Sequence, residues 1–265
     1  MDITSADLHI HTNLSLCAVE SARAGAYIDA AARGNIKTVG FSNHYWDEDV
    51  PGASDWYKVQ NTQHVMQLKE ELGDVSQYPV RVLFGCECEF AHGDTLSISE
   101  KKAQLFDYVL VPHSHTHMLG FVLPVDCQSP EKHADFLVKS FFGVVTHPLA
   151  KQYITGIVHP FDPCGKTSEQ AKEILSGISD SVFYECACAA KENNVAVELN
   201  SSSFTNLAGA AMPEYLRFYH ACKKAGCVFF SGSDRHKVRE YDSADPFMKL
   251  KGIADGLEIT DLLTL

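Results

Sequence analysis

The sequence places two histidines, His9 and His11, two residues apart in the stretch ADLHIHTNLSLC near its start. Asp7 precedes the pair and Cys17 follows it, so four side chains of metal-binding types lie close together. In a β-strand, alternate side chains point to one face, so a strand here would place Asp7, His9 and His11 together. Such a pair can hold a metal ion, and it can equally be two buried histidines with hydrogen-bond partners. This stretch alone leaves both interpretations open.

Side chains of the same chemical types recur at the ends of later apolar segments. They are His44, Glu87, Glu89, His113, His115, His159, Asp234 and His236. Imidazole and carboxylate ligands together suit Zn, Mn or Fe. Because a tetrahedral ion needs only about four ligands, and a carboxylate can bridge two ions, we expect a cluster of two or three metal ions.

The segments that must position these residues alternate between short apolar runs and helical stretches. We expect strands at 7–11, 38–44, 80–90, 108–114, 156–161, 195–201 and 227–236. We expect helices at 21–33, 60–72, 99–105, 131–142, 170–174, 182–192 and 213–225. This alternation implies parallel strands joined by crossover helices. Seven such units favour a (β/α) barrel, although periodicity leaves an open doubly wound sheet as the alternative.

The position of the metal-binding side chains along the strands indicates where the site lies. In a parallel barrel the carboxyl ends of all strands open on one face, where active sites form. The residues named above lie at or near those ends. Because unrelated core histidines would not gather there, the sequence predicts a metal site at that face of the barrel.

Composition limits the classes of partner. The chain has 265 residues, 45% of them hydrophobic, with 22 Lys and Arg against 34 Asp and Glu, a net charge of −12. This acidic balance argues against long nucleic acid as a partner, but not against small anionic substrates, because bound cations reverse the local charge. Without low-complexity segments, long linkers or internal repeats, we expect a single domain over residues 1–265.

The cysteines and the start of the chain bear on its compartment. The nine cysteines form no CxxC pair, so neither a disulfide framework nor a structural zinc finger is expected. The start of the chain shows no basic stretch followed by an apolar run. No apolar run approaches the roughly 18 residues of a membrane span. We therefore expect a cytoplasmic protein, with no prediction of its oligomeric state.

The motifs taken together resemble one family. DLHIHT, FSNH, GCECEF, VPHSH, VHP and GSDRH, in this order, are similar to the motifs of the PHP (polymerase and histidinol phosphatase) family over nearly the whole chain. The length resembles its stand-alone, histidinol-phosphatase-like branch. The resemblance implies a distorted seven-stranded (β/α) barrel, similar to a TIM barrel. It also implies three divalent metal ions, which can be Zn, Mn, Fe or a mixture.

The resemblance also implies a set of metal ligands. His9, His11, Glu87 and Asp234 would hold one metal; His44, His236 and Cys17 a second; and Glu87, His115 and His159 a third. Motif position favours Glu87 over Glu89 and His115 over His113. His159 is favoured over His147 because an apolar strand precedes it. Cys17 stands where the family often has histidine or aspartate, so a ligand and a small buried cysteine are both open.

The activity implied by the resemblance is phosphoester hydrolysis. We expect a metal-bound hydroxide at the trinuclear site to attack a small phosphorylated substrate and release phosphate. Asp234 and His236 would hold metal and are the candidates to pass the proton. On an ideal strand, Arg235 between them would point to the opposite face and be a weak phosphate clamp, unless the strand has already ended before it.

One motif departs from the family. The stretch ELNSSSF lacks a nearby arginine that histidinol phosphatases use on the substrate phosphate, which weakens histidinol phosphate as the substrate. The hydroxyls of Ser201, Ser202 and Ser203 are alternative donors. The loop from His44 to Tyr57 is either a lid over the substrate, with Trp46 or Trp56 against it, or a surface loop whose aromatic side chains pack on a neighbouring helix.

Other functions compete with the phosphomonoesterase. A phosphodiesterase or exonuclease acting on nucleotides or short oligonucleotides would use similar chemistry. An amidohydrolase would share the histidine pair and the late aspartate, but no lysine ends the fourth or fifth strand here. A non-catalytic metal-binding protein is the third alternative. The size of the ligand set speaks against it, because a structural site needs fewer ligands.

Overall fold

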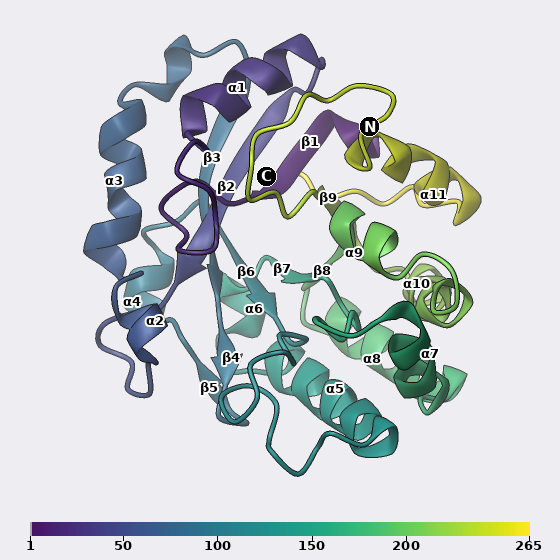
Figure 1. Ribbon diagram of the computed structural model, residues 1–265. Helices are drawn as coiled ribbons and strands as arrows, with labels where there is room; N and C mark the ends of the chain where they lie inside the picture. Colours follow the sequence, from purple (N-terminus) through teal and green to yellow (C-terminus); the bar gives the residue numbers. More distant parts are fainter. Residues whose placement is uncertain (1) are drawn as a thin grey trace.

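Seven parallel strands form one sheet in the order β1-β2-β3-β6-β7-β8-β9 in the computed structural model, which describes residues 2–265 (Figure 1). The strands are β1 (Ala6–Ile10), β2 (Thr38–Tyr45), β3 (Arg81–Cys88), β6 (Tyr108–Pro112), β7 (Gly156–Val158), β8 (Ala196–Asn200) and β9 (Phe229–Gly232). The first and last strands approach each other, because the His11 amide donates to the Arg235 carbonyl at 2.9 Å and the Asp234 amide to the His9 carbonyl at 2.7 Å. The sheet is thus nearly closed, which confirms the distorted barrel.

Helices cover the outside of the sheet. They are α1 (Ala24–Arg33), α2 (Asp55–Lys58), α3 (Thr62–Leu72), α4 (Glu100–Ala103), α5 (Pro130–Val145), α6 (Ala150–Tyr153), α7 (Ser168–Ser176), α8 (Asp180–Glu192), α9 (Ser201–Asn206), α10 (Met212–Ala225) and α11 (Leu250–Gly256), with 3-10 turns at Ile3–Ser5, Val75–Gln77 and Phe247–Lys249. Figure 1 shows α1 and α3 beside β1–β3, and α5, α8 and α10 on the other side of the barrel. Among residues 2–265, no helix is both long and apolar enough to cross a bilayer.

The interior of the barrel is filled by an apolar floor centred on Tyr108. Leu8, Leu83 and Leu110 are buried with it in one cluster. The Tyr108 hydroxyl donates to the Leu8 carbonyl at 2.8 Å. Neighbouring strands make room for its ring with glycine, because a Cβ on Gly85 would lie 2.2 Å from the ring. This apolar floor fills the barrel below the carboxyl ends of the strands, so a site at those ends is open to solvent only on that face.

A bulge in β1 changes which side chains of that strand point inward. Asp7 pairs with Val39 and Ile10 with Phe41, so two residues of β1, Leu8 and His9, face one residue of β2. Bulges of this kind redirect a side chain next to an active site. The expectation that Asp7 shares a face with His9 is therefore wrong. Asp7 lies on the outward side, where its carboxylate accepts hydrogen bonds from the Tyr241 hydroxyl at 2.7 Å and the Ser233 amide at 2.9 Å.

The other differences from expectation lie at element ends. β9 stops at Gly232, so Asp234 and His236 stand on the loop that follows rather than on the strand. The expected strand over 80–90 ends at Cys88, and a separate antiparallel hairpin follows it, formed by β4 (Phe90–Ala91) and β5 (Thr95–Leu96). Helices α2, α6, α9 and α11 were not expected. The serine run after Asn200 forms α9, because the Asn200 side chain caps its first turn by accepting from the Ser203 amide.

Candidate metal centre

The Glu87 carboxylate lies at the centre of the histidines that end the strands. It is buried at the end of β3, with His9 Nε2 at 3.6 Å, His44 Nδ1 at 2.9 Å and His159 Nε2 at 3.1 Å. These histidines come from three other strand ends, β1, β2 and β7. One carboxylate thus stands within reach of ligand atoms from across the barrel mouth.

The first group of ligand atoms consists of His9, His11 and Asp234. The two Nε2 atoms are 3.1 Å apart, and the Asp234 carboxylate lies 3.6 Å from His9 Nε2 and 3.3 Å from His11 Nε2. Glu87 also reaches His11 Nε2 at 3.4 Å. Ligand atoms bound at about 2.0–2.2 Å to one tetrahedral ion are separated by similar distances, so this group has the spacing of a metal site.

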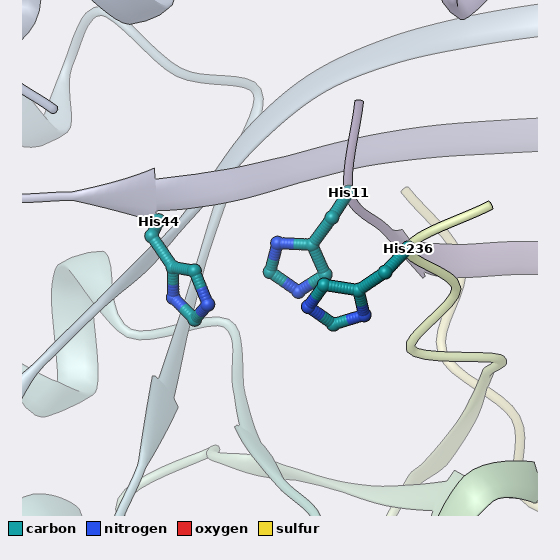
Figure 2. Close-up of side chains that lie close together, drawn as sticks. All are labelled: His11, His44 and His236. Carbon is teal, nitrogen blue, oxygen red and sulfur yellow. The ribbon is translucent and has the colours of Figure 1, made fainter. Parts of the chain in front are cut away.

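The second group consists of His11, His44 and His236 (Figure 2). The rings of His11 and His236 are stacked with centroids 4.3 Å apart, and His44 faces His11 at 4.5 Å. The His236 Nδ1 atom is hydrogen-bonded to the Asp234 carbonyl at 3.0 Å, which leaves the Nε2 atom of His236 free to bind a metal ion. Since His11 also belongs to the first group, the two groups are adjacent.

The third group consists of Glu87, His115 and His159. Glu87 Oε1 lies 3.1 Å from His159 Nε2 and 3.7 Å from His115 Nε2. The rings of His115 and His159 are stacked, with centroids 4.8 Å apart. The structure thus brings eight of the nine expected ligands into three adjoining groups.

Cys17 is the expected ligand that lies outside these groups. It is exposed and lines the mouth of the site together with His44 and His236. Burial of the sulfur and the nearby carboxylates of Glu87 and Asp234 raise the pKa of the Cys17 thiol to about 12. In the absence of a bound cation, the thiol is therefore the neutral form.

The alternative histidine ligands, His113 and His147, lie outside the ligand groups. His113 uses both ring nitrogens in the core: Nδ1 contacts the Leu137 carbonyl at 3.1 Å, and Nε2 accepts from the Phe161 amide at 2.8 Å. His147 lies in the turn between α5 and α6, where its Nδ1 accepts from the Leu149 amide. Neither belongs to a ligand group among residues 2–265.

Hydrogen bonds from outside the groups orient the ligands. Glu198 Oε1 contacts His9 Nδ1 at 2.8 Å, and Glu198 Oε2 accepts from the His159 amide at 2.6 Å. Glu89 Oε2 contacts His115 Nδ1 at 2.6 Å and accepts from the Tyr57 hydroxyl at 2.7 Å. Partners of this kind fix the ring orientation and tautomer of a metal-binding histidine. Glu89 therefore holds the ring of a candidate ligand, His115, and belongs to no ligand group among residues 2–265.

Neutral partners hold the other rings. Ser15 Oγ contacts His11 Nδ1 at 3.0 Å and donates to Asn43 Oδ1 at 3.0 Å. Ser114 Oγ contacts His159 Nδ1 at 2.7 Å. Asn43 thus acts on His11 through Ser15. Sequence reasoning also missed Glu198, Ser15 and Ser114, whose roles follow from contacts between distant segments; the one available signal was the carboxylate in ELNSSSF.

The pKa shifts at the centre keep one carboxylate ionised and one imidazole neutral. Burial opposes the charged form of Glu87, yet His44, His9 and His159 together hold the pKa of that carboxyl well below its usual range. Burial and the neighbouring His236 and His44 keep the pKa of His11 well below its usual value, so the ring is neutral and its lone pair is free. The Glu87 carboxylate and the His11 ring are thus in the protonation states that bind metal. Burial opposes protonation of His9 and His115, but neighbouring carboxylates, Glu198 above all, raise the pKa of His9 well above its usual value, and Glu89 raises the pKa of His115 to about 9. These two rings would therefore lose a proton when a cation binds.

Two buried atoms at the centre have no hydrogen-bond partner. They are His44 Nδ1 and Glu87 Oε2, which lie 2.9 Å apart without the alignment of a hydrogen bond. An unpaired buried polar atom costs about 1–3 kcal/mol. A divalent cation between such atoms would satisfy both. The donor set and these two atoms therefore fit divalent metal ions.

The backbone is strained at two of the ligands. His159 has φ of 30° and Asp234 has φ of 53°, a region that residues other than glycine rarely adopt. Each such residue costs on the order of 1–3 kcal/mol and persists where the surroundings enforce it. Both turns direct side chains from a strand end back over the barrel mouth.

A cavity of about 220 Å³ opens above the ligands. Its walls include Trp56, Tyr57 and His117 as well as Cys17. Trp46 is buried elsewhere, in a small apolar cluster with Tyr57. Of the two tryptophans in the 44–57 loop, Trp56 is the one at the site, with its ring edge-on to His44 at 5.2 Å. The loop therefore forms one wall of the cavity.

Comparisons with known proteins agree with this arrangement. The family model described as the PHP domain matches residues 7–202. The structure is similar to that of histidinol phosphate phosphatase from Lactococcus lactis, solved with Zn, L-histidinol and phosphate, with a TM-score of 0.64, 17% identity and coverage of 98% of this chain and 96% of that one. A Listeria monocytogenes protein described as a candidate histidinol phosphatase has a TM-score of 0.63, 10% identity and coverage of 90% and 98%. At these identities the two structures show the fold alone. A sequence comparison with curated proteins finds no match.

Proposed function

This chain belongs to the PHP family, and from that membership we propose that it is a metal-dependent phosphatase that hydrolyses a small phosphomonoester. The observation that carries the proposal is the place of Glu87, one buried carboxylate beside ligand atoms from three groups. A site that only stabilises the fold needs fewer ligands and no open cavity. Here an open cavity lies directly above the ligands.

We propose three ion positions at the barrel mouth. His9, His11, Glu87 and Asp234 would hold the first ion; His44 and His236, with Cys17 from the cavity wall, the second; and Glu87, His115 and His159 the third. The ions are Zn, Mn or Fe. When bound, divalent cations lower the pKa of water and neutralise phosphate oxygens. The protein contributes the fixed geometry, through the contacts of Glu198 and Glu89 with His9 and His115.

Asp234 and His236 are the candidates for proton transfer. Both side chains are partly exposed to the cavity, at 24% and 33%, whereas Glu87 and His9 are buried. A group that exchanges a proton with substrate or solvent must be reachable from the cavity. The leaving oxygen would take its proton from this side of the site.

The substrate phosphate has few protein donors in this cavity. Arg235 does not serve, because its guanidinium binds the Asp245 carboxylate at 2.6 Å on the outward side. The Ser202 hydroxyl donates to the Ser233 carbonyl at 2.8 Å, and Ser203 is buried at the start of α9. Phosphate recognition therefore falls mainly to the cations. The substrate of the Lactococcus relative, histidinol phosphate, is accordingly a weaker candidate here than the class of small phosphomonoesters.

Phosphate release tests the proposal. The protein, loaded separately with Zn, Mn or Fe, is assayed with histidinol phosphate, sugar phosphates, mononucleotides and an aryl phosphate, with D234A as the matched variant. Metal-dependent release that D234A loses supports the phosphatase. Full activity in D234A would remove Asp234 from the site. Cleavage of phosphodiesters without release from monoesters would replace the phosphatase by a nuclease-type activity.

A further inference from the structure

A second cavity lies beside the metal centre and shares a wall with it. This side pocket has a volume of about 310 Å³ and is lined by Ser202, Asn206, Asp234, His236, Lys237 and Arg239, among others. Asp234 and His236 also line the cavity above the ligands. A substrate whose phosphate lies at the metal centre would therefore have the side pocket next to it, across His236.

The charge of the side pocket is positive in a chain whose net charge is −12. Three cationic and two acidic side chains line it: Arg235 is neutralised by Asp245 at 2.6 Å, and Asp234 belongs to the first ligand group, where a bound cation would neutralise it. Lys237 and Arg239 have no side-chain partner for a hydrogen bond or ion pair within residues 2–265. The nearest acid in sequence, Glu240, is held by Arg33 at 2.6 Å. Two cations are thus free to bind an anion from the pocket.

The loop that carries these cations is held in place. Arg235 Nη1 donates to the Arg239 carbonyl at 2.8 Å, and its guanidinium lies 3.8 Å from the centroid of the Tyr241 ring. Tyr241 is in turn tied to Asp7 on β1 at 2.7 Å. Arg235 therefore acts as a support that places the backbone between Lys237 and Arg239. A loop whose backbone is already fixed loses less entropy when its side chains bind an anion.

We propose that the substrate is a phosphomonoester whose leaving group ends in a second anionic group, a carboxylate or a phosphate, which Lys237 and Arg239 bind in the side pocket. The inference rests on the proposed function for the orientation of the substrate. The polar lining from Ser202 and Asn206 suits a hydroxylated linker between the two anions. The Ser202 hydroxyl, which donates to Ser233, keeps lone pairs to accept from such a linker.

Binding of matched phosphonates tests the inference without turnover. The metal-loaded protein is titrated calorimetrically with propylphosphonate and 3-phosphonopropionate, which differ by a terminal carboxylate, and with propane-1,3-diphosphonate. Butylphosphonate and 4-phosphonobutyrate cover a longer span. We expect at least one ligand with a second anionic group to bind about tenfold or more tightly than its alkyl partner, as hydrogen bonds to charged groups allow.

The variants assign that preference to the pocket. In K237A/R239A the ratio of the two affinities should fall towards one, whereas K151A/K191A, which removes the same charge on α6 and α8, should keep it. Equal affinities in the unaltered protein, no binding of any ligand, or a preference that survives K237A/R239A would each overturn the inference. Phosphate release from simple monoesters is read separately. Phosphate release without a preference for the ligands with a second anionic group would support the phosphatase and contradict the anion pocket. Such a preference without phosphate release would support the pocket and contradict the phosphatase.

Discussion

Glu198 Oε1 lies 2.8 Å from His9 Nδ1 in the interior of the barrel, where both side chains are fully buried. The contact fixes the ring so that Nε2 points to His11 and Asp234. Glu198 also accepts from the His159 amide, so one carboxylate holds residues of two ligand groups.

Removal of this carboxylate should weaken metal binding while every ligand stays in place. We expect E198Q to lower the metal affinity by about 10- to 100-fold, the usual effect of losing a partner of a metal-binding histidine. Competition with a chromogenic chelator measures it. E192Q, at the exposed end of α8, is the matched control and should bind metal as the unaltered protein does. An unchanged affinity in E198Q would mean that the His9 ring needs no such support.

Loss of Glu87 should affect more ions than loss of a ligand at the edge. Glu87 contacts atoms of all three groups, whereas His115 belongs to the third alone. We expect E87A to lose most of the bound metal and H115A to retain the ions of the first two groups. Elemental analysis of the purified, dialysed proteins gives the metal-to-protein ratio. Equal ratios in the two variants would contradict the shared position of Glu87.

Removal of metal should lower the stability of the fold. The candidate ligands come from the ends of β1, β2, β3 and β7 and from the loops after β6 and β9, so bound ions would cross-link strands around the barrel. A ligand at about 1,000 times its dissociation constant adds about 4 kcal/mol to the free energy of unfolding. We expect chelator-treated protein to melt at a lower temperature, and added Zn or Mn to reverse the shift. Identical melting curves would show that the groups hold no ion at these concentrations.

Gly232 should tolerate no side chain. A Cβ there would lie 1.9 Å from Glu198 Oε1 and 2.5 Å from the His9 Cβ. We expect G232A to displace Glu198, with a loss of about 1–3 kcal/mol in stability, as for other overpacked cores, and with weaker metal binding. G25A is the control, because nothing lies within 4 Å of its Cβ in α1. It should stabilise the helix by about 0.5–1 kcal/mol. Denaturant unfolding of both variants measures the change in the free energy of unfolding. A G232A protein as stable as the unaltered one would contradict the expected clash.

The Glu48–Lys102 pair should give a small, pH-dependent contribution to stability. Partial burial opposes ionisation of Glu48, but hydrogen bonds from Lys102 and Thr62 lower its pKa from 4.5 to about 2. A carboxyl whose pKa is lowered by folding stabilises the fold at pH values above its ordinary pKa. That stabilisation is lost as the pH falls from 4.5 towards 2. For an exposed pair we expect E48Q to cost only about 0.5–1 kcal/mol at pH 7. Urea unfolding should show the difference shrinking below pH 4.5; a difference that does not change with pH would argue against the pair.

The seven strands and their positions along the chain could be predicted from sequence, because buried parallel strands are short apolar runs. The candidate metal ligands follow directly after these runs. The residues at which the strands end were harder to predict. His159 and Asp234 turn the chain with positive φ, and polar residues there have the same alternation as a continuing strand. No helix was expected over the serine run beginning at Ser201, although Asn200 before it is a common helix cap.

The ligand set could be inferred from motifs, but its supports could not. Glu198 and Ser15 act on His9 and His11 through contacts between distant segments, and no local pattern reports them. The bulge in β1 was equally hidden, because strict alternation of side chains gives no sign of an extra residue. The pairing of Arg235 with Asp245 agrees with its expected outward direction, for a reason that lies in the loop rather than in a strand.

The bulge between Asp7 and Ile10 makes consecutive residues perform different tasks on the same side of the barrel. Leu8 belongs to the apolar floor, and His9, the next residue, belongs to the metal centre. No layer of intervening side chains therefore insulates the ions from the core. A change that repacks Tyr108, whose hydroxyl binds the Leu8 carbonyl, is transmitted through one peptide unit to a ligand. We therefore expect substitutions that change the thermal stability of this core to change the metal affinity of the candidate centre as well.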